Sequence, residues 1–380
     1  MVSSAVTFLT VLTVSAAFLN YSQSFYTQAG IRGGQASLRQ SHLTVIRNLR
    51  MAGYGMEPKY AFDFPSDWMR ASSRNNNMSN RLVFRMRNPS FNAVAQTVTN
   101  AGITLKEPLK ETLRQGQLIQ VMCEGAAGWG YARLTADSPV KSSALTLSGA
   151  LDKFPNTKKL EDVECFKPSS NTRIYVFKID VYDYSIRFID DRPYLFRQHG
   201  LGATTSSDPY GEPVAEDIEA FRVTFLREDG TPFIPDPTAD APEYDTPVTV
   251  PPHPWRTNRH PANIRAVIVG MVARSSTRDL STTTSNSIPA FSKSETGVAA
   301  YVPSPSGGPG PQSIPLEPEI TLDRGTGKPL APGIRRVVSE MTVQVRNMRS
   351  SAMSVPLYSL EAGACKGGGV PSNDYNCAGG

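Results

Sequence analysis

The sequence predicts an α+β protein in which one long N-terminal helix precedes an antiparallel β-sheet head with long loops. Three observations predict this class. The chain opens with an apolar segment and has no charged residue before Arg32, helical spacing of apolar residues continues to Met51, and the pattern then changes to the alternation of strands. With 380 residues, of which 39% are hydrophobic and 19% charged, the chain is neither a disordered tail nor a multi-span membrane protein.

The apolar segment covers residues 2–19, which read VSSAVTFLTVLTVSAAFL. As a helix it would span ~27 Å, close to the hydrocarbon thickness of a bilayer. A secretory signal peptide would carry Lys or Arg before its apolar core, and a buried core helix would rarely open without a polar cap. We therefore predict a transmembrane or filament-core half over residues 1–28. Its Ser and Thr residues suit close packing against other helices, and they also suit an ordinary anchor.

The helical pattern continues as an amphipathic half over residues 29–52, which we expect to pack on the head. Glycines at 30, 33 and 34 predict a bend or a loosening, and Gly53 and Gly55 mark the end of the helix. The positions that we expect to pack or to assemble along the two halves are Val6, Leu9, Leu12, Phe18, Leu38, Val45, Ile46 and Leu49.

Residues 53–380 are expected to form one β-rich globular head. The clearest hairpin joins two alternating stretches through the turn Asp190-Asp191-Arg192-Pro193. A sheet with one covered face would take the amphipathic half of the helix as its cover. Predicted strands lie at 82–86, 118–122, 144–147, 174–188, 221–226, 264–272 and 337–345.

Two segments of the head, 229–262 and 281–333, are rich in Pro, Ser, Thr and Gly and lack periodic apolar residues. Because proline removes a ladder donor, we interpret both as long loops between strands. Loops of this length are uncommon without a role, and a partner contact and a solvated insertion are equally compatible with their composition.

The four cysteines contain no CxxC pair, so a zinc site is poorly supported. An even number after an apolar start fits an oxidising compartment. Cys365 and Cys377 enclose a stretch of Gly, Pro, Ser and Asn, and we expect them to be bonded as a C-terminal disulfide loop. Cys123 with Cys165 is the favoured second pair, although mixed pairings and free thiols remain open.

Charge and motifs argue against nucleic-acid binding and against catalysis. Four arginines and no acid lie in residues 1–56, which leaves only one of the five net positive charges for the rest of the chain. No nucleophile-elbow, phosphate-loop or zinc-protease signature is present, and no cofactor or metal is expected. The pairs Asp190-Asp191 and Glu216-Asp217 are typical of turns and caps, and Asn373 with Asp374 offers too few ligands for calcium.

Four segments together resemble the PilW-type minor pilins of type IV pilus systems. They are SLRQSHLTVIRNLRMAGYG at 37–55, PVAEDIEAFRVTFLREDGT at 213–231, NIRAVIVGMVARS at 263–275 and RRVVSEMTVQVRNM at 335–348. The ending LRMAGYG is the most specific piece. The resemblance implies a pilin-like fold and a non-enzymatic subunit that helps to prime pilus assembly in a minor-pilin complex at the pilus tip, supporting adhesin display, adhesion and twitching motility.

The same resemblance implies the partners and the location. Partners would be other minor pilins, the major pilin, a tip adhesin and the inner-membrane assembly machinery. The chain would reside in the bacterial inner membrane before assembly and at the pilus tip afterwards, with its head in the periplasm or outside the cell. The alternative is the related J-type pseudopilin at the tip of a type II secretion pseudopilus.

One departure from the family concerns the start of the chain. The family opens with a glycine, a cleavage point and a Phe-Thr-Leu-x-Glu-Leu-like motif, whereas the first acid in this chain is Glu57. MVSSAVTF resembles the continuation of that motif, so we expect Met1 to lie inside it. A true start at Met1 would put peptidase processing and glutamate-dependent docking in doubt.

Overall fold

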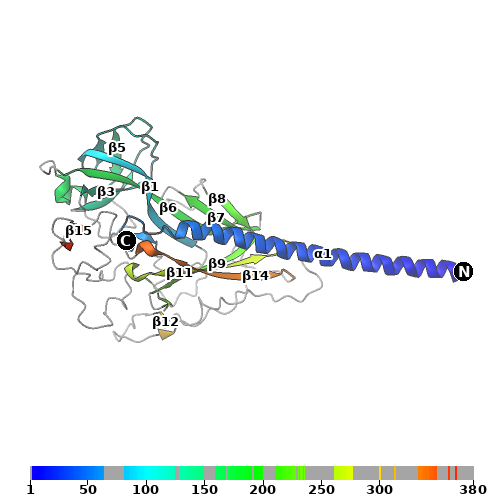
Figure 1. The fold of residues 1–380 in the computed structure, drawn as a ribbon. Coiled ribbons are helices and arrows are strands. Elements are labelled where there is room, and N and C mark those ends of the chain that lie inside the picture. Colours follow the sequence, from blue (N-terminus) through cyan, green and yellow to red (C-terminus); the bar gives the residue numbers. More distant parts are fainter. Residues whose placement is uncertain are drawn as a thin grey trace.

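The structure is a computed structural model in which a long helix joins a head of β-sheets (Figure 1). Its described residues are 2–63, 81–124, 128–148, 159–167, 170, 172–190, 192–199, 211–227, 230, 232–233, 235, 261–276, 299–300, 312–313, 333–348, 358–359 and 364–365.

Helix α1 runs without interruption from Val2 to Leu49. At 1.5 Å per residue it is about 70 Å long. The glycines 30, 33 and 34, where a bend or a loosening was predicted, do not interrupt the helix, because glycine still donates its backbone N–H to the helix and only lowers helix propensity. After Leu49 a series of turns leads into the short helix α2 (Pro58–Ala61).

The transmembrane half predicted over residues 1–28 is not confirmed. Among the helices of the described residues, none combines the length and the apolar character that crossing a bilayer demands. In this half the polar residues Thr7, Thr10 and Asn20 lie among the apolar ones.

The larger sheet has eight strands in the order β1-β2-β5-β4-β3-β6-β7-β8, and β1 also pairs with β6. That extra pairing closes six of the strands, β1 to β6, into a ring, which we call the distal ring because Figure 1 places β3 and β5 at the end of the head away from the N-terminus. The strands are β1 (Arg81–Val98), β2 (Gly102–Leu105), β3 (Leu118–Cys123), β4 (Trp129–Leu134), β5 (Ala144–Ser148), β6 (Ile174–Ile189), β7 (Arg192–His199) and β8 (Glu212–Glu216).

The two longest strands, β1 and β6, each take part in two layers of the head. The second part of β1 and the first part of β6 belong to the ring, whereas their other parts continue with β7 and β8 as a sheet beside α1. The register of β1 against β6 shifts between Arg87 and Asn92, where β1 passes from one layer to the other. The strands β1 and β6 therefore continue from the distal ring into the helix-bearing part of the head.

A second sheet has the order β10-β9-β11-β14, and all of its pairings are antiparallel. Helix α1 contacts β11 and β14 of this sheet as well as β8 of the first, so the helix lies between two sheets (Figure 1). The amphipathic half therefore covers a sheet as predicted, and it contacts strands of two sheets rather than one. The bounds are β9 (Ile218–Leu226), β10 (Pro232–Phe233), β11 (Ala266–Arg274) and β14 (Arg336–Gln344).

Buried apolar residues form separate cores in these two parts of the head. One core surrounds α1 between the sheets and includes Leu49, Phe84, Tyr184, Phe221 and Val267. Another fills the distal ring, with Ile119, Val121 and Leu145 among its members. The head is therefore built from a helix-bearing lobe and a ring lobe, although the sequence predicted one undivided head.

All seven predicted strands are present, and the predicted hairpin is confirmed as the pair β6–β7, with Asp190 in a left-handed conformation (φ 49°). Strands β2, β4 and β8 were missed. Most of 229–262 and 281–333 lies outside the described residues, but short strands occur where loops were expected. Besides β10 these are β12 (Ala299–Ala300) and β13 (Gln312–Ser313); short elements elsewhere are β15 (Tyr358–Ser359), β16 (Ala364–Cys365) and the 3-10 turns Leu160–Asp162, Glu164–Phe166, Pro261–Asn263 and Arg346–Met348.

Candidate assembly surface on the long helix

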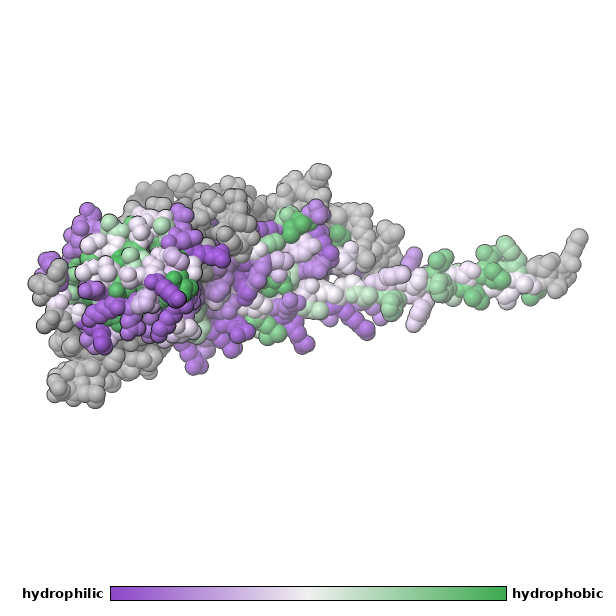
Figure 2. All heavy atoms as spheres, turned by 90° about the horizontal axis from the view of Figure 1, so that it is seen from above, coloured by the Kyte–Doolittle hydropathy of each residue, from purple (hydrophilic) through white to green (hydrophobic). Residues whose placement is uncertain are grey.

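The first half of α1 presents large apolar side chains to solvent. Of the residues predicted to pack there, Val6 is 56% exposed, Leu9 61%, Leu12 49% and Phe18 68%. At 100° per residue, the exposed apolar positions fall on every side of the helix rather than on one stripe. Figure 2 shows hydrophobic side chains along the protruding helix. Further members of this set are Phe8, Val11, Val14, Leu19, Tyr21, Phe25 and Tyr26.

The hydroxyl groups of Thr10, Thr13 and Ser22 in this half are satisfied within the helix itself. Thr10 Oγ1 donates to the carbonyl of Val6 at 2.9 Å, and Thr13 Oγ1 donates to the carbonyl of Leu9 at 3.1 Å. These bonds to the preceding turn are typical of Ser and Thr in helices with apolar surroundings. A neighbour could therefore cover this half without leaving these hydroxyls unpaired.

The second half of α1 has one buried face. Leu38, Val45, Ile46 and Leu49 are at most 9% exposed and recur at helical spacing. Side chains beside this face hold the helix in place: Gln40 Nε2 donates to the carbonyl of Val214 in β8 at 3.0 Å, and Asn48 Nδ2 lies 2.7 Å from the Tyr184 hydroxyl. We call residues 2–29 the exposed half and Gly30–Leu49 the packed half.

The LRMAGYG segment forms the turn that ends the packed half. Gly53 and Gly55 have φ values of 77° and 70°, a region that favours glycine. A Cβ at Gly53 would lie 2.8 Å from Met348 Sδ, and one at Gly55 would lie 2.7 Å from Arg87 Nε. The Gly53 N–H donates to the carbonyl of Arg85 at 2.9 Å. Gly55 therefore permits the close approach of this turn to β1, and Gly53 permits its close approach to the 3-10 turn that contains Met348.

Arg87 of β1 is a buried cation at the join between the two lobes. Its Nη2 donates to the carbonyl of Gly55 at 2.6 Å and its Nε donates to Gln120 Oε1 of β3 at 3.0 Å. The guanidinium also lies 4.1 Å from the centre of the Phe177 ring. Burial lowers the pKa of Arg87 to about 10, so it remains charged at neutral pH. Arg87 thus ties the turn after α1 to the ring strands.

Asp217, between β8 and β9, is the acidic centre of a second polar cluster. Its carboxylate lies 2.6 Å from Arg192 Nη2 and 3.4 Å from Arg274 Nε. Asp217 also has a positive φ of 58°, which agrees with the predicted turn role of the Glu216-Asp217 pair. No local pattern in the sequence indicated these ion pairs, because Arg192 and Arg274 are distant from Asp217 along the chain. Through these two ion pairs Asp217 connects β7 with β11, and we call this cluster the Asp217 brace.

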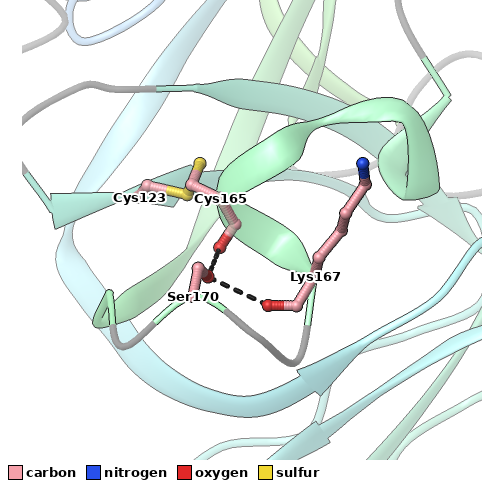
Figure 3. Close-up of a disulfide and its surroundings, with 4 residues drawn as sticks. All are labelled: Cys123, Cys165, Lys167 and Ser170. Carbon is pink, nitrogen blue, oxygen red and sulfur yellow. Dashed lines mark hydrogen bonds between the residues drawn. A yellow bond between two sulfur atoms is a disulfide. The ribbon is translucent and has the colours of Figure 1, made fainter.

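The predicted pair Cys123–Cys165 is confirmed as a disulfide, with its Cα atoms 6.3 Å apart (Figure 3). It joins the end of β3 to the 3-10 turn at 164–166 inside the ring core. Ser170 Oγ donates to the carbonyl of Cys165 at 2.5 Å and holds the chain beyond the bridge. A Cβ at Gly128 would lie 2.9 Å from Cys165 Sγ, so only glycine fits beside the sulfur.

The structure separates the predicted packing positions into two groups. Val6, Leu9, Leu12 and Phe18 are exposed, whereas the four positions beyond Gly30 are buried against the head. Two other predictions lie outside the described residues: the Cys365–Cys377 disulfide, of which no side chain is described, and the Asn373-Asp374 pair.

Comparisons with known proteins add little to this geometry. No family model matches the chain, and no curated protein matches it. Among solved structures, it is similar to a type IV-like pilin from Thermus thermophilus, with 16% identity, coverage of 62% of this chain and 86% of that chain, and a TM-score of 0.21. At that TM-score the likeness carries no argument here.

Proposed function

We propose that this chain is a pilin-like filament subunit whose exposed half packs among the helices of neighbouring subunits. The observation that carries the proposal is the exposed half itself. A helix that is apolar on every side is normally buried, in a protein core or in lipid, and exposed apolar surface of this extent marks an interaction site. The packed half fixes the helix to the head, so the head would be displayed outside such a bundle.

The finer proposal is a PilW-type minor pilin that helps to prime type IV pilus assembly at the tip. Its support is the place of the four resembling segments in the fold. LRMAGYG forms the docking turn of α1, 213–231 covers β8 and β9, 263–275 covers β11, and 335–348 covers β14. All four belong to the helix-bearing lobe. The distal ring would then be the part of the head particular to this subunit.

Partners and location follow from this role. The partners would be other minor pilins, the major pilin, a tip adhesin and the inner-membrane assembly machinery. The chain would pass from the inner membrane to the pilus tip at the cell surface, and the Cys123–Cys165 disulfide supports an oxidising compartment for the head. The role is structural rather than catalytic.

Deleting the gene tests the role. The expected result is fewer surface pili at unchanged levels of major pilin, with recovery when the intact chain is restored. A matched pair of complementing variants, Leu9→Asp in the exposed half and Thr104→Asp on the distal ring, should separate assembly from general surface charge. Leu9→Asp should fail to restore pili and Thr104→Asp should succeed. Normal piliation in the deletion strain would overturn the proposal, and lost enzyme export with intact pili would assign the J-type pseudopilin role.

A further inference from the structure

The solvent face of the packed half, together with the residue directly after it, carries a row of arginines. Arg32, Arg39, Arg47 and Arg50 are all exposed, on the side of the helix away from Leu38, Val45 and Leu49. At 100° per residue the four lie within about 80° of one another around the axis and extend over ~27 Å along it. Leu43 lies in the same row and is 63% exposed. We call these five residues the arginine row.

Within the described part of the chain, no acidic side chain balances the charge of the arginine row. Helix α1 contains no acidic residue, and the first acid after it is Glu57. None of the ion pairs formed among the described residues includes an arginine of the row. By contrast, Arg81 of β1 and Arg192 of β7 are each paired with an aspartate. As far as the described residues show, the row is thus a basic surface without an acidic counterpart.

The position of the row argues against lipid headgroups as its ligand. Arg32 lies 13 residues beyond Leu19, which corresponds to ~20 Å along the helix, and Arg50 lies ~47 Å beyond it. Attraction to an anionic membrane surface falls off within a Debye length, about 8 Å at physiological salt. If the apolar segment 2–19 were placed in a lipid layer, most of the row would be too distant from the headgroups to bind them.

A second copy of this chain is also disfavoured as the partner. Packing two α1 helices in parallel would bring one arginine row beside the other, and like charges in contact suppress association. An acidic surface would instead be attracted, and Leu43 offers an apolar contact at the centre of the row.

We propose that the arginine row is a docking surface for an acidic segment of a different filament subunit. This inference rests on the proposed function, because the exposed half would bring a neighbouring helix alongside α1. It adds that the neighbour is selected by charge, and that the row disfavours direct neighbours that are copies of this chain.

Site-specific photo-crosslinking tests the partner. A photoreactive amino acid replaces Leu43 in the full chain, cells are irradiated, and the adduct is mapped to a peptide by mass spectrometry. The expected adduct is a peptide of another pilin-like subunit with several Asp or Glu residues. The double variant Arg39→Glu, Arg47→Glu should lower its yield about tenfold, since like charges in contact are strongly unfavourable. Reversal of the mapped acids to Lys should restore it.

The control carries the same change in charge on the distal ring. Lys106→Glu with Lys110→Glu replaces two exposed lysines remote from α1 and should leave the yield unchanged. An adduct with a second copy of the chain, with lipid or with a peptide poor in acids would overturn the inference. An equal crosslinking yield with and without the Arg39→Glu, Arg47→Glu change would also overturn it. Binding of the intact chain to vesicles of anionic phospholipid that is lost in Arg39→Glu, Arg47→Glu would also contradict it.

The two proposals fail in different ways. If the deletion strain makes normal pili, the filament role itself is wrong. If piliation depends on the chain but Arg39→Glu, Arg47→Glu restores it fully, the filament role stands and the charge-selected partner is wrong.

Discussion

The two halves of α1 have different sources of stability. In the packed half, Val45 and Leu49 are fully buried by the two sheets, and the solvent face is charged. In the exposed half, Leu9 and Phe18 are more than half exposed, and every side of the helix carries apolar residues. The comparison teaches that the chain stabilises only one half of its helix by itself. Under the proposed function, helices of neighbouring subunits cover the other half, and the arginine row begins shortly after it.

The first prediction concerns the distal ring, where loss of the disulfide should lower the free energy of unfolding more than the next two changes do. Removing the disulfide with Cys123→Ala and Cys165→Ala opens a loop with a sequence separation of 42. In the loop-entropy model this costs about 4 kcal/mol. Because the ring has its own core, hydrogen exchange should accelerate in β3, β4 and β5 first while the packed half keeps its protection. Equal loss of protection in α1 would show that the two lobes unfold as one unit.

A smaller effect is expected at the turn that anchors the packed half. Gly55→Ala should destabilise the chain by about 2 kcal/mol, because a left-handed alanine is strained and its Cβ would overlap Arg87. Denaturant unfolding measures the change.

Gly33→Ala is the matched control for Gly55→Ala. The site of its Cβ has no neighbour within 4 Å, and a helical alanine is favoured by up to ~1 kcal/mol. If both variants lose equal stability, the close approach of the turn to β1 is not the cause.

The smallest effect is a dependence on pH that belongs to the packed half. Burial lowers the pKa of His42 below its usual 6.5, and a weaker contribution from the backbone of Ser339 opposes this. The unfolded chain therefore binds a proton before the folded chain does. The contribution of neutral His42 to the free energy of unfolding is complete above pH 6.5 and decreases as the pH falls through and below that value. His42→Leu should flatten the decrease between pH 7.5 and about pH 5.5 in unfolding experiments, and an unchanged slope would contradict this origin.

Much of the fold was predictable because its signals are local. Strands such as β6 and β11 are long and rich in β-branched or aromatic residues, and the packed half repeats its apolar residues at helical spacing. The missed strands β2, β4 and β8 are only four to six residues long, and β8 contains a proline. Closure of the ring depends on β1 pairing with both β2 and β6, which no local pattern reveals.

The candidate site was predictable only in part, for a related reason. The change from an unbroken apolar run to amphipathic spacing predicted which apolar positions of α1 the head covers, and Leu49 is buried whereas Leu12 is 49% exposed. The Asp217 brace was not predictable, since Arg274 reaches it only through the pairing of β9 with β11. Contacts of this kind depend on the pairing of strands that are distant in sequence, and residue type alone does not reveal that pairing.

The most direct test places the same substitution in both halves of α1 and measures unfolding and assembly together. Leu12→Asp should change the free energy of unfolding by no more than about 0.5 kcal/mol and should fail to restore pili in a deletion strain. Leu49→Asp should cost more than about 4 kcal/mol, because it buries an unpaired charge. A Leu12→Asp chain that restores pili, or that is destabilised as much as the Leu49→Asp chain, would contradict the division of the helix into a self-stabilised half and an assembly half.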